Sequence, residues 1–219
     1  EWISQTNHYR NELFAKDHPL ISTKKLEVLR NFPPKKWAEL YANQKENNSK
    51  TTKFVYIGSL SLTNTYLREF CQWIIGQNGR ASFDIFSFNL HDEVVDFLNE
   101  LASKYIRIHS DGIEYSQIPN ILSSFDVGVV LYKAYSKNVI YCVSNKFYEY
   151  KTCGLDIWYS KDMIAIENLE AQDGMPGILG IDFTQLKRIN NYEVTKSIKR
   201  GSSIQESSEH EYRKLIDVF

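Results

Sequence analysis

Short apolar runs alternate with amphipathic stretches along most of this chain, and this alternation limits the folds that it can adopt. Apolar residues between the runs recur three and four positions apart, which is the spacing of a helix with one buried face. After the first run these residues are Leu67, Phe70, Cys71 and Ile74. The runs themselves have the length and composition of buried strands, and they are residues 54–57, 83–86, 105–108 and 126–131.

Repeated strand–helix–strand units favour one architecture. Right-handed crossovers place helices on both faces of a parallel sheet. We therefore predict an α/β fold, a Rossmann-like parallel sheet with helices on both faces. Residues 155–159 add a fifth strand, residues 174–180 form a loop with room for a short strand, and residues 207–218 form a closing helix.

The chain before residue 54 has a different organisation. Residues 3–6 predict a short strand, residues 7–16 a helix and residues 25–29 a second strand, which the Asn-Phe-Pro-Pro sequence at residues 31–34 ends. A stretch rich in lysine and asparagine follows, which is typical of a linker or exposed loop. We therefore divide the chain into a crossover segment (1–42), a linker (43–53) and a ligand-binding domain (54–219).

Composition and charge exclude several classes of function. The 219 residues carry a formal net charge of -1, so we expect no affinity for the phosphate backbone of nucleic acids. The cysteines, Cys71, Cys142 and Cys153, are odd in number and widely spaced, which indicates reduced thiols in a cytoplasmic protein. No apolar run approaches the length of a membrane span, so we expect at most peripheral contact with a membrane. The five histidines share no spacing, and we expect no metal site.

The segment from Ser144 to Gly154 combines a helix start, a cation, a carboxylate and a helix stop. We expect Ser144 to cap the helix and Gly154 to end it in the left-handed conformation. A carboxylate such as Glu149 can accept hydrogen bonds from both hydroxyls of a ribose, while the helix N-terminus holds phosphates. The alternative is a glutamate that only the helix dipole favours near the helix start.

Three other places are candidate ligand contacts, each with a structural alternative. Asn145 and Lys146 stand at the helix entrance, where they could bind a diphosphate or lie on the solvated surface. Gly58 follows the first strand of the domain and allows either close approach of a ligand or a tight turn. The polar loop 132–138, which includes Asn138, is either a binding loop or a variable surface loop.

Two common nucleotide-binding motifs are absent from the sequence. The chain contains neither G-x-G-x-x-G after a strand nor the Walker lysine motif. This excludes typical nicotinamide-dependent dehydrogenases and P-loop nucleotidases.

With these residues in view, residues 144–155 resemble the N-K-x-x-E-Y-x-x-x-G segment of glycosyltransferases with the GT-B architecture, of the group 1, family 4-like kind. Residues 125–132, 55–60 and 28–33 are similar to the strand before that segment, the first strand with its glycine loop, and the crossover between domains. The resemblance implies a C-terminal, donor-binding domain. It further implies that Glu149 holds the ribose, that Asn145 and Lys146 face the diphosphate, and that Gly58 and Ser59 lie near the phosphates.

The chain departs from this pattern at three positions. Residues 60–64 supply neither the arginine nor the lysine that many relatives carry after the glycine loop. Tyr141 stands where one branch of the family has an acidic residue, and Leu155 stands where a proline is usual. The sequence therefore leaves a retaining and an inverting mechanism both open.

The sequence as a whole predicts the donor-binding part of a glycosyltransferase that takes a sugar from a UDP- or GDP-sugar in surface polysaccharide or glycan synthesis. Lys146 and the helix dipole would stabilise the departing diphosphate, and no further cofactor is expected. Because the chain begins with Glu1, we expect it to be part of a longer protein whose N-terminal domain supplies the acceptor site, and the piece alone to be inactive. The alternatives are a non-catalytic Rossmann-like binding module and a UDP-sugar epimerase-like domain.

Overall fold

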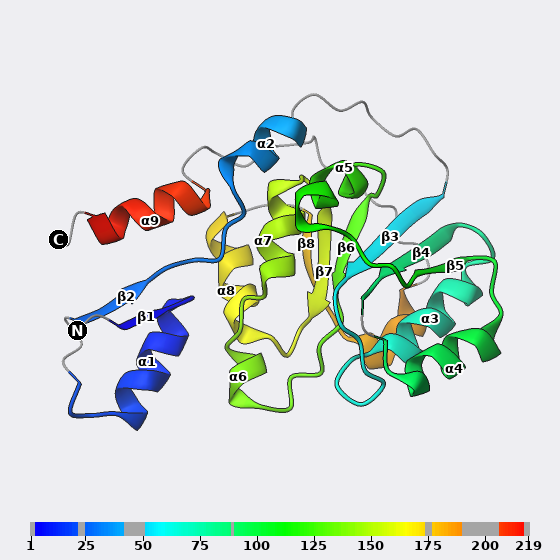
Figure 1. Cartoon of the computed structure of the whole chain (residues 1–219). Coiled ribbons are helices and arrows are strands. Elements are labelled where there is room, and N and C mark those ends of the chain that lie inside the picture. Colours follow the sequence, from blue (N-terminus) through cyan, green and yellow to red (C-terminus); the bar gives the residue numbers. More distant parts are fainter. Residues whose placement is uncertain are drawn as a thin grey trace.

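The computed structural model of the chain describes residues 3–21, 25–41, 51–88, 90–173, 177–189 and 206–216. Its centre is a six-stranded sheet in the order β5-β4-β3-β6-β7-β8 (Figure 1), and every neighbouring pair is parallel. Counted from β3, this is the doubly wound order 3-2-1-4-5-6 of Rossmann folds. The predicted α/β fold is confirmed. The strands are β3 (Thr52–Ile57), β4 (Ala81–Phe86), β5 (Ile106–His109), β6 (Val127–Val130), β7 (Asp156–Ser160) and β8 (Ile178–Ile181).

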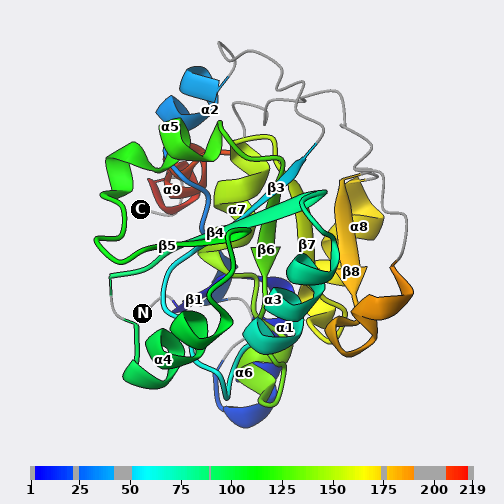
Figure 2. The same cartoon turned by 90° about the vertical axis from the view of Figure 1, so that its right-hand side faces the viewer.

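Helices cover both faces of this sheet (Figure 2). One face packs against α5 (Ile118–Leu122), α7 (Asn145–Thr152) and α8 (Ile164–Asp173). The other face packs against α3 (Leu67–Gly76), α4 (Asp92–Leu101) and the 3-10 segment η3 (Phe183–Arg188). The connections also contain the 3-10 turn η2 (Tyr115–Gln117) and the short helix α6 (Lys137–Ile140).

The chain before β3 folds beside this sheet as a separate small unit of β1 (Ile3–Gln5), α1 (His8–Asp17) and β2 (Leu26–Val28). The two strands pair in parallel, so the strand–helix–strand order predicted here is present. The helix α2 (Lys35–Tyr41) follows, and it was not predicted. Residues 43–50 of the predicted linker, like residue 42 before it, lie outside the described residues, and β3 begins at Thr52, before the predicted boundary at residue 54. The division into domains stays a prediction.

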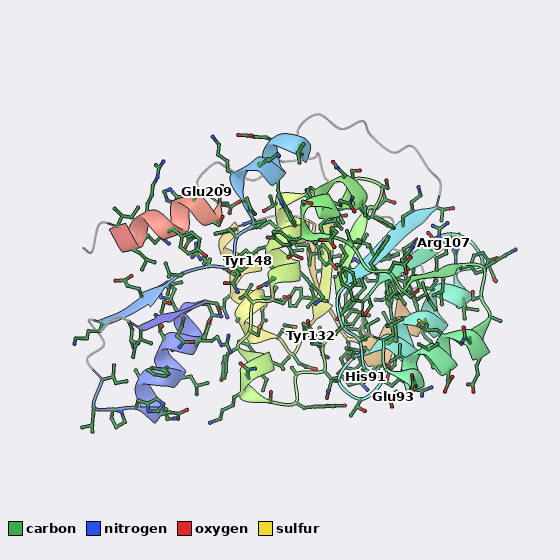
Figure 3. The ribbon with its side chains drawn as sticks, viewed as in Figure 1. His91, Glu93, Arg107, Tyr132, Tyr148 and Glu209 are labelled. Carbon is green, nitrogen blue, oxygen red and sulfur yellow. The ribbon has the colours of Figure 1, made fainter. Side chains whose placement is uncertain are left out.

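The last described helix, α9 (Ser208–Ile216), corresponds to the predicted closing helix and packs against the crossover segment. The Glu211 carboxylate accepts a hydrogen bond from the backbone N–H of Arg30 at 3.0 Å. The Glu209 carboxylate, labelled in Figure 3, accepts one from the backbone N–H of Lys35 at 2.9 Å. These bonds join α9 to Arg30, which follows β2, and to Lys35, the first residue of α2.

Three elements differ from the sequence prediction. The loop 132–143 contains the short helix α6, and residues 164–173 form α8, for which no helix was predicted. The third of these elements, α5, is shorter than expected, because it ends at Leu122 rather than near residue 125. All three are short or weakly amphipathic, so their apolar residues give little periodic signal.

The packing of α7 against the sheet depends on a glycine in β6. A Cβ at Gly128 would lie 2.2 Å from the ring of Tyr150, which is fully buried. The Tyr150 hydroxyl in turn accepts a hydrogen bond from the backbone N–H of Ile57 at 3.2 Å. Tyr150 therefore fixes α7 against both β6 and β3.

We expect Gly128→Ala to destabilise the fold by about 2 kcal/mol or more, because neither the ring nor the strand can move away from the added methyl group. The matched control is Gly76→Ala in α3, where an added Cβ would meet no atom within 4 Å. That change is expected to stabilise by about 0.5–1 kcal/mol. Urea unfolding of both variants checks this, and equal stabilities would contradict the role given to Gly128.

Candidate functional site

The candidate site lies where the order of the sheet reverses. The strands β3 and β6 are neighbours, and their crossover connections leave toward opposite faces of the sheet. Ligands of doubly wound sheets bind beyond the carboxyl ends of such strands. Gly58 follows β3, Tyr132 lies just after β6, and α7 begins beside them.

Lys146 is held in a cage of aromatic and glycine residues at this point. Its ammonium donates a hydrogen bond to the hydroxyl of Tyr132 at 2.7 Å (Tyr132 is labelled in Figure 3). The same nitrogen lies 5.0 Å from the centre of the Tyr56 ring and 5.1 Å from that of the Tyr132 ring. Such distances give favourable cation–π interactions.

Gly58 makes room for this cation. Its φ is +121°, which side chains rarely allow, and a Cβ there would lie 2.9 Å from the Lys146 ammonium. The sequence left open whether Gly58 only makes a turn, and the structure places it against Lys146. The prediction that it also lies near phosphates stays a prediction.

Tyr56, which lies beside Lys146, keeps its hydroxyl proton. Burial, followed by the neighbouring Tyr132 and Tyr150, raises the pKa of Tyr56 well above its usual value. The Tyr56 hydroxyl donates a hydrogen bond to the backbone carbonyl of Ser59 at 2.8 Å. Within the described part of the chain, no carboxylate lies within ion-pair distance of Lys146, so its positive charge is available to an anion.

Glu149 lies nearly one turn further along α7 and is buried. Burial raises the pKa of its carboxyl group, and the charge of Lys146 offsets part of that rise. The side chain makes no hydrogen bond to any other described residue. A buried carboxylate without hydrogen-bond donors is costly, and groups of this kind are concentrated at functional sites.

Tyr115 interacts electrostatically with Glu149. Burial, and next the charge of Glu149, raise the pKa of Tyr115 to about 12. The Tyr115 ring is half exposed, and its centre lies 4.7 Å from that of buried Trp37 in α2. Tyr115 therefore places an exposed aromatic ring within electrostatic range of the Glu149 carboxylate.

The start of α7 is open. Ser144 is the N-cap residue, but its side chain makes no capping hydrogen bond, so the prediction that Ser144 caps the helix is wrong. Its hydroxyl is buried and has no hydrogen-bond partner among the described residues. Its backbone has the extended conformation usual for an N-cap residue, with φ -71° and ψ 156°, so the missing bond does not come from the backbone. The uncapped N–H groups can bind an anion.

The end of α7 agrees with its prediction. Gly154 has φ +64°, the left-handed conformation expected of it. The N–H of Leu155 donates to the carbonyl of Tyr150 at 3.0 Å, as in a Schellman ending.

The polar candidates lie in different surroundings. The Asn145 side chain is exposed and accepts a hydrogen bond from the Asn31 side chain at 2.9 Å. Asn138 is exposed on α6 and accepts a hydrogen bond from the guanidinium group of Arg10 in α1. The structure thus brings Gly58, the Ser59 carbonyl and the Lys146 cage together, with Glu149 nearby on α7, whereas Asn138 is engaged with the N-terminal segment.

Three tyrosines of the site were not singled out from the sequence. Tyr56 was assigned to a buried strand, Tyr132 only to a polar loop, and Tyr115 to no element. A tyrosine near the end of a predicted strand, two residues before a glycine, was the one available signal for Tyr56. No group of three or more metal-ligating side chains occurs among the described residues. No helix in the described part of the chain has the length and apolar character needed to cross a membrane.

Comparisons with known proteins agree with the fold. No protein-family model and no curated protein sequence matches the chain. Among solved structures, the UDP-GlcNAc 2-epimerase of Methanocaldococcus jannaschii is 9% identical over 99% of this chain and 61% of its own, with a TM-score of 0.52. A protein of Listeria monocytogenes described as a UDP-N-acetylglucosamine 2-epimerase is 10% identical over 100% of this chain and 59% of its own, with a TM-score of 0.54.

The C-terminal domain of a glycosyl transferase group 1 family protein from Francisella tularensis is 12% identical over 84% of this chain and 95% of its own, with a TM-score of 0.44. The two comparisons with the higher scores show the fold: the chain has the Rossmann-like architecture of one half of a GT-B protein. The chain spans about three fifths of the length of both epimerases.

The raised pKa of Glu149 predicts a pH dependence of stability. The folded protein holds the carboxyl proton more tightly than the unfolded chain does, so stability falls as pH rises from the ordinary carboxyl value, about 4.3, through the raised one. Glu149→Gln removes this loss. We therefore expect the variant to gain stability relative to the original chain as pH rises from about 4 to 7.

Urea unfolding across this pH range measures the difference. Glu100→Gln, at an exposed position of α4, is the matched control. A difference between Glu149→Gln and the original chain that does not change with pH would contradict the assignment.

Proposed function

We propose that this chain is the donor-binding part of a glycosyltransferase that takes a sugar from a UDP- or GDP-sugar. The observation that carries the proposal is the arrangement on α7: an uncapped helix start, a caged cation at Lys146 and a buried, unpaired carboxylate at Glu149. These groups lie at the switch point of a doubly wound sheet, where ligands of this architecture bind.

Each group has a separate role in the proposed complex. Glu149 accepts hydrogen bonds from the ribose hydroxyls, which replace the solvation that it loses by burial. The first N–H groups of α7 and the Lys146 ammonium bind the diphosphate, with Gly58, Ser59 and Asn145 beside it. Tyr115 offers an exposed ring to the base.

Lys146 is the proposed stabiliser of the leaving group. When the bond between the sugar and the diphosphate breaks, negative charge grows on the phosphate oxygens, and a fixed cation lowers the energy of that state. The cage keeps the cation in place before the substrate arrives, so little reorganisation is needed. Tyr132 accepts the hydrogen bond from Lys146 and so fixes the direction of the ammonium group before the phosphate binds.

The proposed reaction needs more than this chain. We propose that a preceding domain of a longer protein supplies the acceptor site and, for an inverting mechanism, the general base. The parallel pair β1 and β2, which stands apart from the main sheet, is consistent with an edge of such a domain. We place the protein in the cytoplasm, in surface polysaccharide or glycan synthesis, with at most peripheral contact with a membrane.

A UDP-sugar epimerase is the second candidate, because two of the similar solved structures, each with a TM-score above 0.5, are described as UDP-GlcNAc 2-epimerases. The two candidates share the nucleotide class but not the reaction. Incubation of the longer parent protein with UDP-GlcNAc alone separates them, since an epimerase changes the sugar without an acceptor and a transferase does not.

Calorimetric titration of the chain with UDP, GDP and their sugars tests the proposed site. We expect Glu149→Gln to weaken binding about tenfold to a hundredfold, because hydrogen bonds to a charged acceptor are lost. Glu100→Gln is the control. Absence of binding by every nucleotide, or equal affinity of both variants, would favour a non-catalytic module instead.

Tyr132→Phe tests the lysine cage. It keeps the ring beneath the Lys146 ammonium but removes the hydroxyl, so we expect affinity for UDP to fall about threefold to tenfold. Affinity for uridine, which has no phosphate, is expected to stay unchanged. An equal loss for both ligands would show that Tyr132 acts only on the fold.

A further inference from the structure

The helix α1 of the crossover segment contacts the connection that leads from β6 into α7 (Figure 1). Asn7, the N-cap residue of α1, donates a hydrogen bond from its side chain to the backbone carbonyl of Tyr141 at 2.9 Å. The rings of Tyr9 and Tyr141 are stacked, with their centres 5.9 Å apart. The start of α1 is therefore held against the residues that directly precede the candidate diphosphate site.

Arg10 extends from the first turn of α1 to α6. Its guanidinium group donates a hydrogen bond to the side-chain oxygen of Asn138. On α1 no acidic residue stands three or four positions away from it, and among the residues that the structure describes no carboxylate lies within ion-pair distance of the group. A guanidinium group has several N–H donors, so the bond to Asn138 leaves others for a ligand.

The charges of Arg10 and Lys146 both act on the segment before α7. Burial raises the pKa of the Cys142 thiol, and the positive charges of Arg10 and of Lys146 offset part of that rise. Both cations are thus within electrostatic range of one side chain, three positions before the first residue of α7. The same connection holds both of them, because Tyr132 bonds Lys146 and Asn138 bonds Arg10. The connection therefore places two cations near the open start of α7.

We propose that Arg10 is a second cation of the diphosphate site, supplied by the crossover segment. This inference rests on the function proposed above. A diphosphate carries more negative charge than one lysine offsets, and a guanidinium group can bind phosphate oxygens through two parallel hydrogen bonds. Arg10 binds oxygens of the diphosphate on the side of α1, and Lys146 binds others. Asn138, which the sequence suggested as a donor contact, positions Arg10 instead.

Calorimetric titration of the chain with pyrophosphate, UDP and uridine tests the role of Arg10. We expect Arg10→Gln to weaken the binding of pyrophosphate and of UDP about tenfold, because charge-assisted hydrogen bonds are lost. Affinity for uridine, which has no phosphate, is expected to stay unchanged. Arg68→Gln, at an exposed position of α3 on the opposite face of the sheet, is the matched control.

The outcomes separate this inference from the proposed function. UDP binding that depends on Glu149 but not on Arg10 would overturn the inference and leave the proposed function in place. Pyrophosphate binding that depends on Arg10, without binding of any nucleotide, would support the second cation and contradict the proposed function. Absence of binding by both pyrophosphate and UDP would overturn both.

Asn138→Asp distinguishes a ligand-binding arginine from one that only holds α1 in place. The new carboxylate keeps the acceptor for Arg10 and adds a negative charge that offsets the guanidinium charge. We expect the affinity for pyrophosphate to fall about threefold to tenfold, whereas Asn99→Asp, at an exposed position of α4, leaves it unchanged. If Arg10 served only to dock α1, the ion pair would preserve or strengthen that contact. Unchanged or higher affinity of Asn138→Asp for pyrophosphate would therefore contradict the proposal.

Discussion

The contact between Gly128 and Tyr150 is the constraint on which the rest of the site depends. Because Gly128 has no side chain, the Tyr150 ring lies directly on the backbone of β6, and its hydroxyl reaches the backbone of β3. The two central strands of the sheet thereby set the height and the rotation of α7. Lys146 and Glu149 lie on the same helix, so their positions relative to Gly58 follow from this contact.

The charges of the site follow from that placement. A short helix with an uncapped start, a cation near its first turn and a buried carboxylate would be an unfavourable combination in the absence of compensating interactions, because the cation opposes the helix dipole and the carboxylate loses its solvation. The tyrosine rings and hydroxyl around Lys146 compensate the first of these costs. For Glu149, no hydrogen bond from the described residues offsets the free energy of burying the carboxylate. Groups whose pKa is shifted in this way are concentrated at functional sites.

The sequence predicted the strands and the main helix well and the fine geometry of the site poorly, for physical reasons. The strands β3, β4, β6 and β7 are nearly continuous apolar runs, and Gly154 ends α7 in the one conformation that glycine favours there. The capping role of Ser144 was wrong because a cap depends on the side-chain rotamer, which the sequence does not determine, and this hydroxyl is buried without a hydrogen bond to the helix N–H groups. The cage around Lys146 could not be predicted, since it joins residues from two strands whose adjacency only the sheet order reveals. The helices α2 and α6 are short and α8 is weakly amphipathic, so their apolar residues do not recur with a clear helical period.

The hydrogen bond between Asn31 and Asn145 ties the helix entrance to the segment before α2. Both amides are exposed, so water competes for the bond and its net strength is small. A phosphate bound at the entrance would accept from Asn145 Nδ2, while Asn145 Oδ1 keeps the hydrogen bond from Asn31, so the two partners share one side chain. Occupation of the entrance and docking of residues 29–34 are then linked equilibria, and linkage is reciprocal: the factor by which a bound phosphate favours docking is the factor by which docking favours phosphate binding. A single weak amide pair is thus enough to make the helix entrance sensitive to the position of the chain that precedes it.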